Sequence, residues 1–181
     1  MSELRIGVIG GSGIGSLLTS EASTVVNVID TPFGAPSAPI TEVDWHGVKV
    51  LLLPRHGVGH VLNPSRVPYR ANIYALKKLG VTHILATGAV GSLRQEFAPR
   101  DLVIADQVID KTHKRANTFF DGAAVHVEFA EPFCPVLRKL LTDAAEGGTA
   151  KRTPPPATSR WKGRRFRPVL KVTCTGSGAA T

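Results

Sequence analysis

The chain has 181 residues, of which 43% are hydrophobic, and a formal net charge of +8. This length allows at most one ordinary domain, or a fragment of a larger one, and the apolar fraction is sufficient for a hydrophobic core. No stretch approaches the roughly 18 consecutive apolar residues of a membrane span and the first residues lack an export signal, so we expect a cytoplasmic protein. The two cysteines, Cys134 and Cys174, form neither a metal-binding pattern nor a disulfide framework, which fits a reducing compartment.

The positive charge is concentrated near the C-terminal end. Residues 146–181 hold eight Lys or Arg residues and one acidic residue, a net charge of +7. Since the whole chain has 22 basic and 14 acidic residues, residues 1–145 hold 14 and 13, a net charge of +1. A nucleic-acid-binding role, the alternative from another functional class, would therefore depend on this tail, where Trp161 and Phe166 lie among basic residues.

The first predicted strand, residues 4–9, leads into a turn that is rich in glycine. Such a turn lets backbone amides approach an anion without a Cβ in the way, and Ser12 adds a hydroxyl. The dinucleotide-binding fingerprint is only approximate, because Ser16 stands at its third glycine. Asp30 lies at about the distance expected for a ribose-binding acid, so a nicotinamide or flavin site stays as the alternative. A phosphate-sized anion is the favoured ligand.

Three further strands are predicted at residues 25–29, 40–45 and 48–54. The last two are joined by a turn at His46 and Gly47. The third strand ends in proline and leads directly into Arg55, His56 and Gly57. A strand that presents an arginine fork at its end is a common way to hold a phosphate or carboxylate. The alternative is an ordinary surface arginine beside a histidine.

Helices and strands alternate in the rest of the first 145 residues. The predicted elements are a helix at residues 67–79, strands at 82–87 and 101–105, and a helix at 134–145. The apolar stripe of the first helix consists of Val67, Ala71, Ile73, Leu76 and Leu79. That of the second consists of Val136, Leu137, Leu140 and Leu141. This alternation predicts an α/β domain with a largely buried sheet.

Two loops stand out among these elements. The strand at 82–87 opens into small residues that begin with Gly88 and Ala89, a second place where backbone amides can face an anion. Residues 111–130 form a long irregular loop that contains basic, aromatic and histidine side chains, among them His126. Loops of this length within a domain are usually functional or disordered.

Five stretches resemble the trimeric purine nucleoside phosphorylase family in order and spacing: residues 6–13, 53–57, 63–73, 89–94 and 130–135. The last stretch favours the branch of the family that acts on 5′-methylthioadenosine. The resemblance implies a three-layer αβα fold with a mixed central sheet, incomplete at the C-terminus. It makes residues 1–145 a partial nucleoside phosphorylase domain.

The resemblance also implies roles for individual residues. Ser12, Arg55 and His56 bind inorganic phosphate, and the backbone of Gly88 and Ala89 lines the phosphate and ribose end. The family often has a threonine where this chain has Gly88, so one hydroxyl contact is missing here.

Two histidines complete the implied site. His60 lies in the phosphate loop, and His126 matches a histidine that reaches across a subunit interface towards the 5′ end of the nucleoside. The alternative for His126 is an ordinary loop histidine. The implied assembly of the full-length form is a homotrimer, with neither a membrane nor a nucleic acid as partner.

The implied reaction is a pentosyl transfer in purine and methionine salvage, the phosphorolysis of 5′-methylthioadenosine to adenine and 5-methylthioribose 1-phosphate. Phosphate attacks C1′ while the glycosidic bond loosens, and the bound anion stabilises the developing oxocarbenium ion. Phosphate is the co-substrate, and no cofactor or metal is required. The near alternative is a purine nucleoside phosphorylase that acts on methylthioinosine or inosine.

Residues beyond about 146 do not resemble the family as written, and the family's purine-binding acid is expected further along. Trp161 is encoded by TGG, so its last base followed by the first two of Lys162 spells Glu in a shifted frame. Neighbouring codons can then spell Val-Glu-Gly-Pro-Ala-Phe-Ser-Thr-Arg-Ala-Glu-Ser, which resembles the family's next characteristic block. We therefore expect that the frame changes between Glu146 and Pro156, so that residues 146–181 are a basic, Pro-rich, disordered tail and the chain is impaired in activity.

Overall fold

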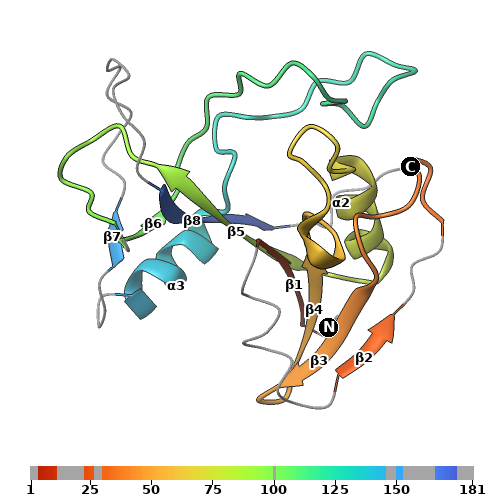
Figure 1. Ribbon diagram of the computed structural model, residues 1–181, viewed down its shortest axis with the longest axis horizontal. Helices are drawn as coiled ribbons and strands as arrows, with labels where there is room; N and C mark the ends of the chain where they lie inside the picture. The colour runs from red at the N-terminus through yellow and green to blue at the C-terminus, as the bar shows by residue number, and fades with distance from the viewer. Residues whose placement is uncertain are drawn as a thin grey trace. The chain divides into compact units, whose positions relative to one another are not determined.

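The computed structural model of the chain describes residues 4–11, 23–26, 30–99, 101–145, 150–152 and 166–174, with the backbone alone for the last two ranges. The contacts divide these residues into two units. Unit 1 comprises the residues up to 84 together with 110–127, and unit 2 comprises 85–109 and 128–174. Each unit has its own strands and its own helix (Figure 1).

The strands of unit 1 form a mixed sheet, as predicted. Their order is β2 (Ser23–Val26), β3 (Ile40–Trp45), β4 (Val48–Pro54) and β1 (Arg5–Gly10). The β2/β3 and β3/β4 pairs are antiparallel, whereas β1 and β4 are parallel. The predicted turn between β3 and β4 is confirmed: His46 and Gly47 have φ angles of 52° and 79°. Two left-handed residues give the tight hairpin whose twist matches that of the strands.

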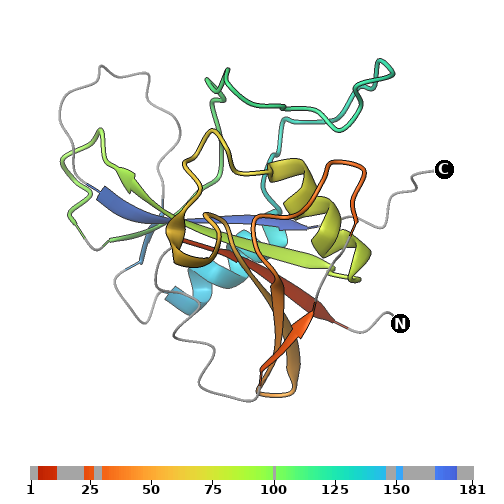
Figure 2. The same ribbon diagram turned by 45° about the vertical axis from the view of Figure 1, so that its right-hand side comes forward.

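Helix α2 (Tyr69–Lys78) lies alongside the strands of unit 1 (Figure 2). Close approach to β1 depends on Gly7, because a Cβ there would lie 3.0 Å from Val81 Cγ1 and 3.3 Å from Leu76 Cδ1. The helix begins two residues later than predicted, since Pro68 occupies the N-cap and disfavours helical backbone at the residue before it.

The buried face of α2 differs from the predicted stripe. Ala71 and Leu76 are fully buried, as expected, but Ile73 and Leu79 are only half-buried. Asn72 is 2% exposed instead. A polar side chain at such a position requires a hydrogen-bond partner, and the N–H of Ser37 provides it.

The strands of unit 2 follow the order β5 (His83–Gly91), β8 (Phe166–Cys174), β6 (Leu102–Ile104) and β7 (Ala150–Arg152). β6 runs parallel to both β7 and β8. Helix α3 (Pro135–Ala145) contacts these three strands. Only part of its predicted apolar face is covered: Leu137 and Leu141 are half-buried, whereas Val136 and Leu140 are 67% and 58% exposed.

Three features of unit 2 depart from the sequence-based expectations. β5 continues through Gly88 and Ala89 to Gly91, where a loop was predicted, because these glycines keep negative-φ backbone and do not break the strand. The segment 146–181 contributes β7 and β8, and the rest of it lies outside the described residues. Cys134 is disulfide-bonded, contrary to the expectation of unpaired cysteines. None of the helices in the described ranges is long and apolar enough to cross a membrane.

Candidate phosphate site

The register of β1 and β4 brings two predicted anion-binding segments together. Gly10 is the partner of Pro54 at the carboxyl ends of these parallel strands. The N–H of Arg55 donates to the carbonyl of Gly10 at 3.0 Å, so the pairing continues one residue beyond β4. A Cβ on Gly11 would lie 3.6 Å from an Nη of Arg55. The guanidinium therefore lies beside the backbone of Gly11, whereas Ser12 lies outside the described residues.

His56 is held through both nitrogens of its ring. Its Nδ1 lies 2.7 Å from the carbonyl oxygen of Leu62, and its Nε2 accepts a hydrogen bond of 3.3 Å from Nε of Arg55. Both side chains of the Arg55–His56 pair are half-buried. Because each makes a directed contact with the other, their orientations are coupled.

Gly57 makes the turn after β4 possible. It is buried, with φ 80° and ψ 169°, a backbone conformation that only glycine adopts readily. Its N–H donates to the carbonyl of Pro54 at 3.1 Å. A Cβ at this position would lie 3.3 Å from the carbonyl oxygen of Ser37, so both the backbone angle and the space favour glycine.

His60 joins the same cluster from the short helix η1 (Val58–His60). Its ring centroid lies 4.3 Å from that of His56, with an interplanar angle of 32°. The residue is exposed and has φ 60°. The structure thus brings together three of the predicted site residues: Arg55, His56 and His60.

Two residues that the sequence analysis did not single out, Ser37 and Asn72, hold the turn after β4 in place. Ser37 Oγ–H donates to the carbonyl of Pro54 at 2.9 Å, and the Ser37 N–H donates to Oδ1 of Asn72 at 2.8 Å. Asn72 is thereby satisfied within the buried face of α2. Its position four residues before Leu76 was the available signal, because residues at that spacing share a helix face.

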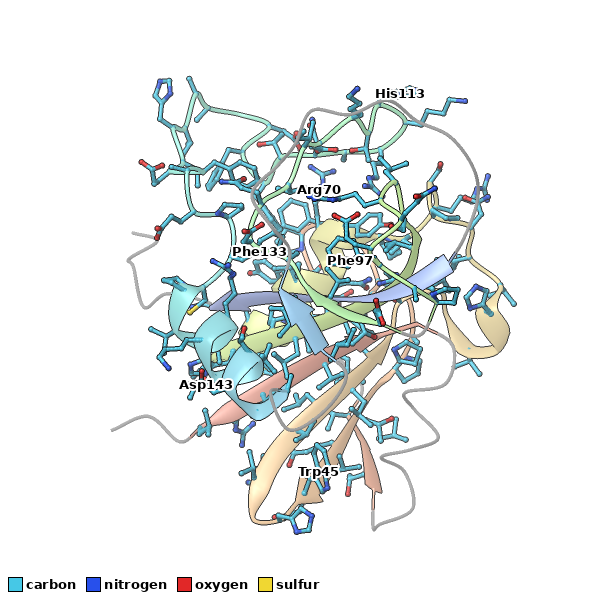
Figure 3. All side chains as sticks on the ribbon, turned by 90° about the vertical axis from the view of Figure 1, so that its left-hand side faces the viewer. Trp45, Arg70, Phe97, His113, Phe133 and Asp143 are labelled. Carbon is cyan, nitrogen blue, oxygen red and sulfur yellow. The ribbon has the colours of Figure 1, made fainter. Side chains whose placement is uncertain are left out.

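The segment that carries His126 is attached to the start of α2. Arg70 forms an ion pair with Asp121 and donates from Nη1 to the carbonyl of Thr118 at 3.1 Å. Its guanidinium also lies 4.8 Å from the ring centroid of Phe33. Figure 3 shows Arg70 between α2 and this segment. His126 itself is exposed.

The other predicted phosphate ligands belong to unit 2. Gly88 is half-buried and Ala89 is exposed, and both lie within β5. Their place at a phosphate stays a prediction. Within the ranges that the structure describes, no group of three or more His, Cys, Asp or Glu residues is arranged to hold a metal ion.

Comparison with known proteins identifies the family. The sequence model of the phosphorylase superfamily matches residues 5–176, past the point near residue 146 where the resemblance was expected to end. The chain is 49% identical to the S-methyl-5′-thioadenosine phosphorylase of Thermococcus kodakarensis over 143 residues, 78% of this chain and 54% of that protein. It is 44% identical to the enzyme of the same name from Mycolicibacterium smegmatis over 166 residues, 87% of this chain and 63% of that protein.

The solved structures agree with the sequences. Methylthioadenosine phosphorylase from Schistosoma mansoni, in complex with tubercidin, superimposes with a TM-score of 0.71 at 43% identity, over 80% of this chain and 53% of that one. The chain spans about half the length of the Thermococcus relative, at 54%. The α/β fold with its mixed sheet is therefore that of the nucleoside phosphorylases, and the chain belongs to the phosphorylase superfamily.

Proposed function

We propose that this chain carries the phosphate-binding part of an enzyme that cleaves 5′-methylthioadenosine with phosphate, giving adenine and 5-methylthioribose 1-phosphate. The relatives named above support this substrate. The observation that carries the proposal is the Arg55 guanidinium, which lies beside Gly11 where the parallel strands β1 and β4 end together. A cation next to exposed backbone amides suits a doubly charged oxyanion.

In this proposal Arg55 and His56 hold the phosphate, with Ser12 and the backbone of Gly88 and Ala89 as further ligands. The phosphate then attacks C1′ of the ribose as the bond to the purine breaks. The anion stabilises the positive charge that develops on the sugar, and this effect is largest where water is excluded. Arg55 and His56 are half-buried, so water is partly kept from their side chains.

The remaining features of the proposal concern the full-length form. We expect it to be a cytoplasmic homotrimer in which His126 reaches the 5′ end of a nucleoside bound to the neighbouring subunit. His60 belongs to the phosphate loop. Inorganic phosphate is the co-substrate, and the chemistry calls for no cofactor or metal.

The 181-residue chain is proposed to have little activity of its own. It spans 54% of the Thermococcus relative, and its purine-binding acid is expected beyond the frame change between Glu146 and Pro156. A chain that lacks this acid can bind phosphate without assisting departure of the purine.

The test is a phosphate-dependent assay of adenine release from 5′-methylthioadenosine by the frame-corrected protein. Arg55→Met is expected to reduce kcat/KM by at least about a hundredfold, since it removes a charge-assisted contact with the reacting anion. Lys78→Met is the matched control, because Lys78 is an exposed cation of α2 that donates to the carbonyl of Asp30. Equal activity of the two variants would refute the assignment of Arg55.

A further inference from the structure

The hydrogen bonds of His56 determine where its proton lies. The carbonyl oxygen of Leu62 can only accept, so the Nδ1 atom that lies 2.7 Å from it carries a hydrogen. The Nε of Arg55 always carries a hydrogen and can only donate, so Nε2 of His56 presents its lone pair at 3.3 Å. These two contacts assign to the ring the neutral tautomer with its proton on Nδ1.

A ring in this state has no hydrogen left for an anion. Oxygens of a fully ionised oxyanion only accept, and the lone pair on Nε2 would repel them. In this geometry His56 acts as a positioning residue, because it orients the Arg55 fork through its Nε contact. Binding an oxyanion directly requires a hydrogen on Nε2.

The proton on Nδ1 is not free to supply that hydrogen. The N–H of Leu62 donates to the carbonyl of His56 at 2.9 Å, while the Leu62 carbonyl accepts from the His56 ring at 2.7 Å. These two bonds close the loop between the residues and hold Nδ1 of the ring at the carbonyl of Leu62. Moving the proton from Nδ1 to Nε2 would leave that carbonyl facing a lone pair, which is unfavourable.

Given the phosphate site proposed above, we propose that His56 binds a fully ionised oxyanion only as an imidazolium: it takes up a second proton at Nε2, releases Nε of Arg55, and the two cations then hold the anion together. In the part of the chain that the structure describes, the charged and titratable groups that face this ring are Arg55 and His60. A doubly negative ligand can contact both cations at once.

Sulfate is the appropriate probe, because it stays doubly ionised near neutral pH and must draw the proton from solvent. Monobasic phosphate can bring its own proton and would hide the effect. Calorimetric titration of the 181-residue chain with sulfate, in buffers of different ionisation enthalpy at pH 7.5, counts the protons taken up. We expect about one proton for each sulfate, and a Kd that rises with pH by up to about tenfold per unit.

Three variants assign the proton. In His56→Gln the amide can still donate, so sulfate is expected to bind without proton uptake. His46→Asn, in the exposed hairpin turn with φ 52°, is the matched control and keeps the uptake. His60→Asn tests the neighbouring ring: uptake that is lost there and kept in His56→Gln overturns the assignment to His56.

The outcomes separate this proposal from the function on which it rests. Sulfate that binds to the unmodified chain with no proton uptake overturns the role of the imidazolium and leaves the phosphate site standing. If neither the unmodified chain nor Arg55→Met shows heat of sulfate binding at any pH between 6 and 8, both the role of the imidazolium and the phosphate site are overturned. The result for the unmodified chain does not depend on whether any variant folds.

Discussion

Asn72 Oδ1 accepts the N–H of Ser37 at 2.8 Å, although the two residues are 35 positions apart. This bond connects the buried face of α2 to the loop before β3. Through the hydroxyl of Ser37 the connection reaches the carbonyl of Pro54, immediately before Arg55. The helix thus influences the proposed phosphate site without contributing a ligand to it.

Replacing Asn72 with alanine is expected to cost about 1–3 kcal/mol of unfolding free energy, because it leaves the N–H of Ser37 without its acceptor. The same variant should weaken sulfate binding, since the turn at Pro54 loses a support. Asn63→Ala is the control: Asn63 is exposed and its Oδ1 accepts the N–H of Ser65 and of Arg66. Urea denaturation compares the two, and equal losses would contradict a special role for Asn72.

Gly57→Ala is expected to be more harmful than Gly34→Ala. Both glycines have left-handed φ angles, 80° and 87°, so both substitutions strain the backbone by about 1–3 kcal/mol. Only Gly57 has a neighbour in the way, the Ser37 carbonyl oxygen at 3.3 Å, whereas nothing lies within 4 Å of a Cβ on Gly34. Thermal unfolding and sulfate titration measure the difference; we expect weakened binding in Gly57→Ala alone.

Removing the Arg70 side chain is expected to loosen residues 110–127. Arg70→Met loses the ion pair with Asp121, the bond to the Thr118 carbonyl and the contact with Phe33. The segment contains three trypsin sites, so its cleavage rate in the native protein reports local opening. We expect cleavage several-fold faster than in the unmodified chain.

Lys139→Met is the control for that experiment. It breaks an exposed ion pair with Asp143 four residues along α3, which contributes little to stability. Cleavage of residues 110–127 should therefore be unchanged. If both variants are cut at the rate of the unmodified chain, the contacts of Arg70 do not hold the segment.

Sequencing the gene across codons 140–175 tests the predicted frame change. We expect one missing or additional base between the codons for Glu146 and Pro156. Restoring the frame should yield a protein that releases adenine from 5′-methylthioadenosine, whereas the 181-residue chain should turn over little of it. Robust turnover by the purified 181-residue chain would contradict this prediction.

The strands β1, β3 and β4 of unit 1 could be predicted because their signals are local, whereas β2 (Ser23–Val26) begins two residues before the strand predicted at 25–29. Buried apolar runs mark β1 and β4. Arg55 directly follows β4 in the sequence, so its place at the end of that strand is known once the strand is predicted. The spacing of Asn72 from Leu76 indicates the buried face of α2, but the hydrogen bond of Asn72 to Ser37 could not be predicted in this way. A polar residue in a helix is usually assigned to the solvent face, and its partner lies in a loop that gives no sequence signal.

The errors in unit 2 have a different cause. Gly88 and Gly91 were interpreted as the start of a loop, but glycine accepts extended backbone as readily as a turn, and neighbouring strands decide between them. The strands Ala150–Arg152 and Phe166–Cys174 pair with β6, which is distant in sequence. Such pairing depends on contacts that no local pattern contains.

β1 and β4 end opposite each other, at Gly10 and Pro54, and this determines which sequence changes the proposed site tolerates. The separation between Gly11 and Arg55 is set by the parallel pairing of β1 with β4, in which Arg5 lies opposite Lys49 and Gly10 opposite Pro54. Substitutions in the core can therefore alter stability while that spacing is preserved. A single inserted residue in either strand would instead displace one half of the site by about 3.3 Å and turn alternate side chains to the opposite face. The geometry of the proposed site therefore depends more on the lengths of β1 and β4 than on the side chains of the core.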